Sequence, residues 1–147
     1  MDTDKLLKEL RRHEGMRNFP YKCSAGKLTI GVGRNIEDIG ITDDEADYLL
    51  RNDILRVQDD LDRNVAYWRV FPERTQRALV NFVFNVGITR ALRFKRMWAA
   101  LSKYDFHQAA DELLDSKYAK QVGRRAEDLA DMIRESENAP DFIGRCR

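Results

Sequence analysis

The stretch HEGMRNFPYKCSAGKLTIGVGR, His13–Arg34, changes its structural character twice. It continues a segment in which leucines recur at helical spacing, and Gly15 is suited to end that helix because glycine readily adopts the left-handed conformation. Two short apolar runs, YKC and LTIGV, then flank the small-residue loop Ser24–Gly26, which predicts a β-hairpin. Glu14 is therefore expected at the end of a short helix, directly before the hairpin.

The remainder of the chain predicts one long helix followed by several shorter ones. Thr42 and Glu45 have capping-box spacing, and apolar residues then recur at helical intervals to about Arg63. Four more helical patterns follow, and Pro72 suits the first turn of the first one. We expect no regular structure in residues 135–147. The sequence thus predicts an α+β fold, mostly α, with a small hairpin lobe, a long helix and a helical lobe.

The composition suits one compact domain or two small lobes that share one core helix, because 147 residues with 43% hydrophobic content can bury a sizeable core. The formal net charge is only +1, but residues 69–104 carry eight Lys or Arg against one acid. This pattern predicts either a positive cleft or solvated helix faces, and the sequence leaves both open. No apolar run approaches the ~18 residues of a membrane span, and the N-terminus is too charged for a signal peptide. We therefore expect synthesis in the cytoplasm without a secretion signal.

Few residues suggest metal or nucleic-acid chemistry. The two histidines and two cysteines, His13, His107, Cys23 and Cys146, have no metal-ligand spacing, so we expect no metal and no cofactor. The segment Arg93–Trp98 mixes bases with aromatic residues, but its apolar positions have the spacing of a helix core. We therefore expect no nucleic-acid partner.

Glu14 has a plausible chemical role. A glutamate at a helix C-terminus faces the negative end of the helix dipole, which favours the protonated carboxyl that a general acid needs. The alternative is an ordinary solvated glutamate. The spacing distinguishes the two: eight residues separate Glu14 from Cys23, and five separate Cys23 from Thr29.

This spacing resembles the phage T4-type lysozyme family, whose pattern is Glu, eight residues, Asp or Cys, five residues and Thr. The segment Thr29–Arg34 is similar to the family's glycine-rich second strand. Arg77–Gly87 is similar to its central buried helix, and Phe106–Ala126 to its later helices. The likeness covers roughly Leu6 to Ile133.

The resemblance implies a two-lobed lysozyme-like fold and a muramidase activity. Residues 1–41 would form the N-terminal lobe with the hairpin, 42–66 the connecting helix and 67–147 the helical lobe, in a single domain 1–147. The enzyme would be an endolysin that hydrolyses the β-1,4 bond between N-acetylmuramic acid and N-acetylglucosamine in peptidoglycan and so lyses the host.

The resemblance also assigns roles residue by residue. The general acid falls on Glu14, the position usually held by a second carboxylate on Cys23, and the water-positioning threonine on Thr29. Arg125 falls on the arginine that pairs with the catalytic glutamate across the cleft. The cleft-lining, substrate-binding positions fall on Gly33, Asn35, Phe84, Asn85, Met97 and Glu112.

Cys23 is the main departure from a pair of carboxylates. A thiol replaces a carboxylate only if it ionises or if the demand on the second group is small, and its ordinary pKa is about 8.5. Lys22 and Lys27 are close in sequence and are expected to lower that pKa. The alternative is a small buried hydrophobe. Two further departures are Arg34, where well-known members have histidine, and the short segment Asn35–Gly40, which replaces an extra hairpin and helix.

Two other functions remain open at this level. A lytic transglycosylase needs only one glutamate, and an inactive module would bind peptidoglycan without cleaving it. The resemblance implies peptidoglycan and a holin-type membrane-permeabilising protein as partners, a monomer, and action on the wall from the periplasm after release from the host cytoplasm. Basic residues expected to hold the anionic wall are Arg34, Arg90, Arg93 and Lys95.

Overall fold

The computed structural model describes residues 1–138 and is mostly helical with one small antiparallel sheet, which confirms the α+β prediction. It divides into two compact units, Met1–Leu49 and the residues from Leu50 onward. The boundary falls within a continuous helix, α2 (Asp43–Asn64). The first unit is called the hairpin unit and the second the helical unit. The single-domain organisation stays a prediction.

The hairpin unit begins with helix α1 (Thr3–Glu14), whose two ends follow from local sequence. At its start, Asp2 accepts a hydrogen bond from the backbone N–H of Lys5 at 3.0 Å, the arrangement of an N-cap. At its end, Gly15 has φ +73° and donates its N–H to the carbonyl of Arg11. The helix therefore stops directly after Glu14, as predicted.

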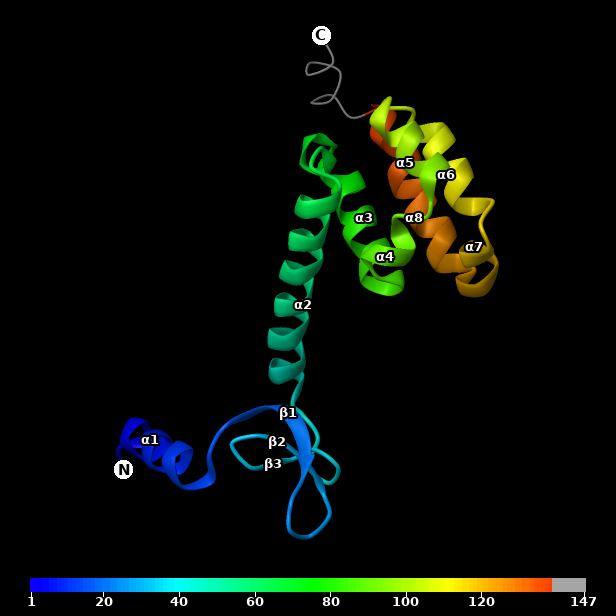
Figure 1. Ribbon diagram of the computed structural model, residues 1–147. Coiled ribbons are helices and arrows are strands. Elements are labelled where there is room, and N and C mark those ends of the chain that lie inside the picture. The colour runs from blue at the N-terminus through cyan, green and yellow to red at the C-terminus, as the bar shows by residue number, and fades with distance from the viewer. Residues whose placement is uncertain (139–147) are drawn as a thin grey trace. The chain divides into compact units, whose positions relative to one another are not determined.

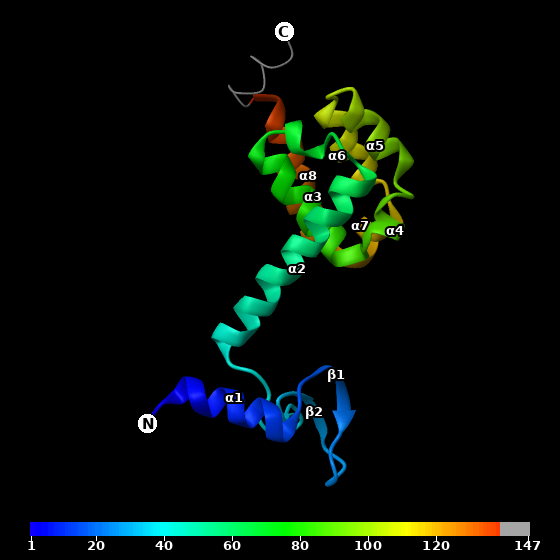
Figure 2. The same cartoon turned by 60° about the vertical axis from the view of Figure 1, so that its left-hand side comes forward.

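The sheet of this unit contains strands β1 (Arg17–Lys22), β2 (Leu28–Gly31) and β3 (Arg34–Asn35), in the order β1-β2-β3 (Figures 1 and 2). β1 begins at Arg17, earlier than the strand expected from the sequence. Its pairing with β2 shifts in register between Arg17 and Tyr21. Pro20 is tolerated within it because β1 is an edge strand. Cys23, expected at the end of the strand, instead lies in the following turn.

The start of α2 carries the predicted capping box. The Thr42 hydroxyl accepts from the N–H of Glu45 at 3.2 Å, and the Glu45 carboxylate accepts from the N–H of Thr42 at 3.0 Å. Arg34 donates to the same carboxylate at 3.0 Å and to the carbonyl of Gly40 at 3.1 Å. The Arg34 side chain therefore fastens β3 to the start of α2, which argues against the expected role in holding the wall.

The helical unit consists of short helices after α2. Their bounds are η1 (Trp68–Val70), α3 (Glu73–Val86), α4 (Ile88–Ala91), α5 (Lys95–Ser102), α6 (Phe106–Leu114), α7 (Lys117–Val122), α8 (Arg124–Arg134) and η2 (Glu135–Asn138). Pro72 is the N-cap residue of α3 and not part of its first turn, a correction of one position.

The expectation of no regular structure after residue 134 is wrong for its first part. η2 forms because buried Ser136 meets the hydroxyl of Thr75 and donates to the carbonyl of Met132. Residues 139–147, with Cys146, lie outside the described residues.

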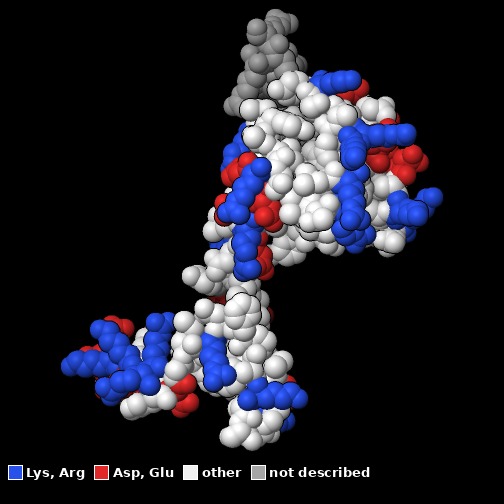
Figure 3. Space-filling view, viewed as in Figure 1, with Lys and Arg blue, Asp and Glu red and all other residues white. Residues whose placement is uncertain are grey.

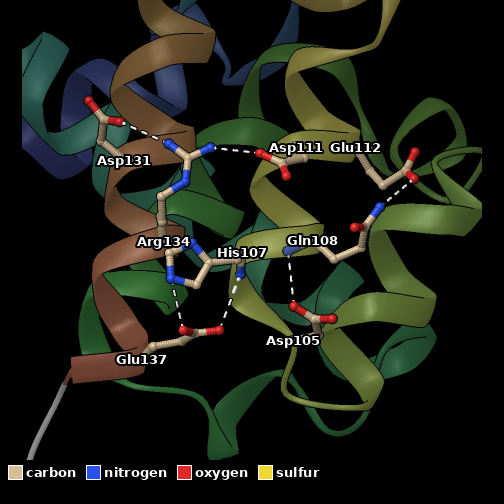
Figure 4. Close-up of polar contacts among 8 residues, drawn as sticks. All are labelled: Asp105, His107, Gln108, Asp111, Glu112, Asp131, Arg134 and Glu137. Atoms are coloured by element: carbon tan, nitrogen blue, oxygen red, sulfur yellow. Dashed lines mark hydrogen bonds and ion pairs between the residues drawn. The ribbon is translucent and has the colours of Figure 1, made fainter.

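The core of the helical unit lies between α3, α6 and α8, and α8 packs against both of the others (Figure 1). Aromatic rings meet edge to face within it: the centroid of Phe82 lies 4.9 Å from that of Phe94 and 5.3 Å from that of Tyr118. Polar contacts join the same helices at the surface (Figure 4): Arg134 of α8 reaches Asp111 of α6 at 2.9 Å.

Candidate active site

Glu14 and Gly33 lie next to each other in the hairpin unit. A Cβ atom added to Gly33 would lie 3.6 Å from Oε2 of Glu14, so the carboxylate lies beside a residue that has no side chain. Gly33 also has φ +75°, a conformation that other residues rarely adopt. The last residue of α1 and the turn between β2 and β3 therefore bring together two of the predicted site residues.

Thr29 lies on the central strand, β2, and is 3% exposed. Its hydroxyl donates to the carbonyl of Lys27 at 2.9 Å. Asn35 is its partner across the β2–β3 ladder. The structure thus places Thr29 and Asn35 side by side.

Cys23 is half-buried in the turn between β1 and β2. Its N–H donates to the carbonyl of Lys27 at 3.0 Å. Hydrogen bonds from the backbone of Lys27 and then Ala25 lower the pKa of the Cys23 thiol; burial opposes them, and the Thr29 hydroxyl adds to them. The prediction that the charges of Lys22 and Lys27 lower the pKa of Cys23 is wrong in its cause, because backbone hydrogen bonds are the main reason for the lowered pKa. The Lys27 ammonium instead pairs with Asp38 at 3.2 Å.

Thr29 and Cys23 are coupled, because a hydroxyl has only one proton to donate. When Cys23 is a neutral thiol, that proton serves the carbonyl of Lys27. When the thiol ionises, the Thr29 hydroxyl can donate to the thiolate instead. The hairpin unit therefore contains the exposed carboxyl group of Glu14, the buried hydroxyl of Thr29 and the Cys23 thiol, whose pKa is lowered.

No group of three His, Cys, Asp or Glu residues within residues 1–138 is arranged to hold a metal ion.

In the helical unit, Phe84 and Arg125 line one hollow of about 600 Å³. Asn85 is exposed near the end of α3. The Arg125 guanidinium donates to the side-chain oxygen of Asn81 from Nη2 at 2.7 Å and from Nε at 3.0 Å. Asn81 was not among the site residues predicted from the sequence, although it lies one helical turn before Asn85. The pairing of Arg125 with Glu14 stays a prediction.

Met97 and Glu112 line a second hollow of about 440 Å³. Met97 is only 1% exposed, so most of its side chain belongs to the core. Glu112 accepts a hydrogen bond from Gln108 at 2.8 Å (Figure 4). The structure therefore brings these two predicted residues together.

Basic side chains border this second hollow. Arg93, Lys95 and Arg96 line it, and Arg90 lies just before them in α4. No ion pair holds any of these four side chains within the described part of the chain. Figure 3 shows a band of Lys and Arg side chains on the helical unit. The positive charges of the four side chains named above are therefore available to an anionic ligand.

The profile of the family described as phage lysozyme matches residues 11–137. The chain belongs to the phage lysozyme family. It is 32% identical over 127 residues to an endolysin of Acyrthosiphon pisum secondary endosymbiont phage 1. The aligned residues cover 84% of this chain and 84% of that relative. It is 33% identical over 111 residues to a SAR-endolysin of bacteriophage PS119, which covers 72% of this chain and 64% of the relative.

Membership of the phage lysozyme family confirms the resemblance seen in the sequence. The matched residues include every site position named above, in both units. Together with the endolysin relatives, the family supports a phage endolysin that degrades peptidoglycan. None of the helices in residues 1–138 is both long and apolar enough to cross a membrane.

Proposed function

We propose that this phage lysozyme is a muramidase that hydrolyses the β-1,4 bond between N-acetylmuramic acid and N-acetylglucosamine in peptidoglycan and thereby lyses the host cell. The observation that carries the proposal is the position of Glu14, at the end of α1 with its carboxylate beside Gly33. Cys23 and Thr29 lie in the same unit at the spacing of the family's other two catalytic positions.

In the reaction, Glu14 protonates the glycosidic oxygen as the sugar leaves. The Thr29 hydroxyl donates one hydrogen bond, to the Lys27 carbonyl or to the Cys23 thiolate, and in either case its oxygen can accept a hydrogen bond from a water molecule and so orient it. Cys23 assists that water or stabilises positive charge at the anomeric carbon. Its lowered pKa increases the thiolate fraction at neutral pH, which is the form that could do either.

The stereochemistry follows from which group attacks. A water held by Thr29 on the far face of the sugar gives inversion, whereas direct attack by Cys23 gives a covalent intermediate and retention. We expect inversion, since Thr29 is the residue assigned to position the attacking water.

Other residues would bind the polymer and neutralise its charge. The proposed substrate-binding positions are Gly33, Asn35, Phe84, Asn85, Met97, Glu112 and Arg125. Arg90, Arg93 and Lys95 would hold the anionic wall, because within the described residues no ion pair engages them.

The biological setting belongs to the same proposal. The protein acts as a monomer on the wall in the periplasm. It is released from the host cytoplasm by a holin-type membrane-permeabilising protein.

One observation favours a second reaction. A thiol in place of the second carboxylate suits a lytic transglycosylase, which needs one glutamate and gives an anhydro-sugar product. The Thr29 hydroxyl argues against it, since that reaction uses no attacking water. Mass spectrometry of digested peptidoglycan separates the two, because the products differ by the mass of one water. An inactive wall-binding module would release no fragments at all.

The decisive test is the substitution Glu14→Gln, assayed by the loss of turbidity of permeabilised cells. The amide keeps the shape of the side chain but has no acidic proton, so the rate should fall by roughly 10²–10⁴-fold. Glu9→Gln is the matched control, because Glu9 is an exposed acid on the same helix. A rate for Glu14→Gln within about threefold of the control would remove Glu14 as the general acid.

A further inference from the structure

The peptide unit between Lys27 and Leu28 connects the two site residues of the hairpin. Its carbonyl accepts a hydrogen bond from the N–H of Cys23 at 3.0 Å and another from the hydroxyl of Thr29 at 2.9 Å. The direction of this one carbonyl therefore affects both the turn that carries Cys23 and the proton of Thr29.

The N–H of the same peptide unit points to a carboxylate. Leu28 donates to Oε1 of Glu37 at 3.0 Å, and the carbonyl of Leu28 accepts from the N–H of Ile36 at 2.9 Å. β3 ends at Asn35, so Glu37 supplies with its side chain the acceptor that a longer third strand would supply with its backbone. A carboxylate on the N–H also polarises the peptide and strengthens its carbonyl as an acceptor.

The side chain of Lys27 is fixed by the same short segment. Its ammonium lies 3.2 Å from Asp38 and 3.9 Å from Glu37. Asp38 is itself held by Asn35, which donates from its amide to the Asp38 carboxylate at 3.0 Å and accepts from the Asp38 N–H at 3.1 Å. Both acids are exposed, so these contacts contribute little stability. Their effect is on orientation.

We propose that Glu37 is a positioning residue for the candidate active site, acting through the Lys27–Leu28 peptide unit on Thr29 and on the turn that carries Cys23. The inference rests on the proposed function only in requiring that Thr29 and Cys23 take part in hydrolysis. Glu37 itself does not touch the reacting atoms.

The first test compares Glu37→Ala with Glu37→Gln. Alanine removes the acceptor for the Leu28 N–H, so kcat should fall by roughly tenfold with little change in KM, since small displacements of catalytic groups are costly. Glutamine keeps an acceptor oxygen and should retain most of the activity. Glu9→Ala, which removes an exposed acid from α1, is the control for the loss of charge.

The second test follows the Cys23 thiol and needs no lytic activity. The alkylation rate is measured against pH in a Cys146→Ser background. The backbone N–H of Lys27, in the preceding peptide unit, is the largest cause of the lowered pKa of Cys23, and the Lys27 carbonyl holds the turn that presents it. Loss of the Glu37 carboxylate should loosen this turn, so Glu37→Ala should move the midpoint to higher pH and Glu37→Gln should not. A residue that only supports the fold would leave this profile unchanged in a folded variant.

The outcomes separate this inference from the proposed function. If Glu14→Gln abolishes lysis while Glu37→Ala changes neither kcat nor the thiol profile, the positioning role is wrong and the muramidase stands. If Glu37→Ala moves the thiol profile in a protein that never cleaves the wall, the proposed function fails and the positioning of the turn stands. Should Glu37→Ala not fold, Glu37→Asp tests the same point, because it withdraws the carboxylate by one methylene; wild-type kcat and thiol profile in that variant would overturn the inference.

Discussion

The hairpin unit and the helical unit hold their side chains in place by different means. Among residues 1–138, every buried hydrophobic side chain lies at Leu61 or beyond. Within residues 1–49, Thr29 alone is buried, and the elements are joined by caps, turns and hydrogen bonds to side chains. The group proposed to perform the chemistry therefore stands in the unit that is organised by hydrogen bonds, and the packed core lies in the other.

This difference predicts how substitutions should act. A buried aromatic ring in the helical unit contributes by excluding water and filling space, so its loss should lower the free energy of unfolding. A hydrogen-bonded group in the hairpin unit contributes by holding the proposed catalytic side chains in a fixed orientation. Its loss should therefore lower the rate of wall cleavage more than it lowers the free energy of unfolding. Three substitutions, in order of decreasing effect, test this contrast.

Phe82→Ala should have the largest effect. Phe82 is 1% exposed and meets Phe94 and Tyr118 edge to face, so its loss should cost about 3–5 kcal/mol of stability. Urea unfolding followed by tryptophan fluorescence reports on this unit, because both tryptophans of the chain, Trp68 and Trp98, lie in it.

Tyr118→Phe is the matched control for this core. The Tyr118 hydroxyl is buried and finds no hydrogen-bond partner within the described residues. Its removal should leave stability unchanged or slightly raised, since an unsatisfied buried polar group is lost. A loss as large as that of Phe82→Ala would mean that this core does not depend on packing in the way proposed.

Thr29→Val should have an intermediate effect, and mainly on the rate. Valine has nearly the same shape but no hydroxyl, so the variant loses both the proposed water contact and the hydrogen bond to Lys27. The rate of wall cleavage should fall by roughly 10- to 100-fold, while stability changes by about 1 kcal/mol.

The same variant should raise the pKa of the Cys23 thiol, because the Thr29 hydroxyl is one of the groups that lower it. Thr29→Ser keeps the hydroxyl and should restore much of the rate. If Thr29→Val unfolded the protein as readily as Phe82→Ala, the hairpin unit would have to be regarded as packed rather than hydrogen-bonded.

Asp62→Asn should have the smallest effect and should depend on pH. Hydrogen bonds from Arg69 and then Trp68 lower the pKa of Asp62, so its ionised form stabilises the fold above the unfolded pKa of about 3.9. That contribution is lost as the pH falls through the folded pKa. The wild type should be slightly more stable than the variant at pH 7, and the difference in urea midpoint should shrink on acidification. A difference that grows in acid would contradict the assignment.

Local signals explain the parts of the fold that were predicted correctly. The stop at Gly15 and the capping box of Thr42 with Glu45 both involve groups within about four residues, so their partners can be identified from sequence. Helical periodicity likewise indicates the core faces of α3, α5, α6 and α8, because the same turn geometry repeats along each helix.

The sequence by itself determined the family, the helices and the spacing of Glu14, Cys23 and Thr29, because these depend on residues close together along the chain. Only the tertiary structure decided which groups those side chains meet. The two-residue strand β3 is too short to show a periodicity, and Glu37 reaches Leu28 across nine positions of sequence. The same holds for the bond between Arg125 and Asn81, 44 positions apart. Such contacts arise when backbone segments fold onto each other, and no local pattern of residues specifies them.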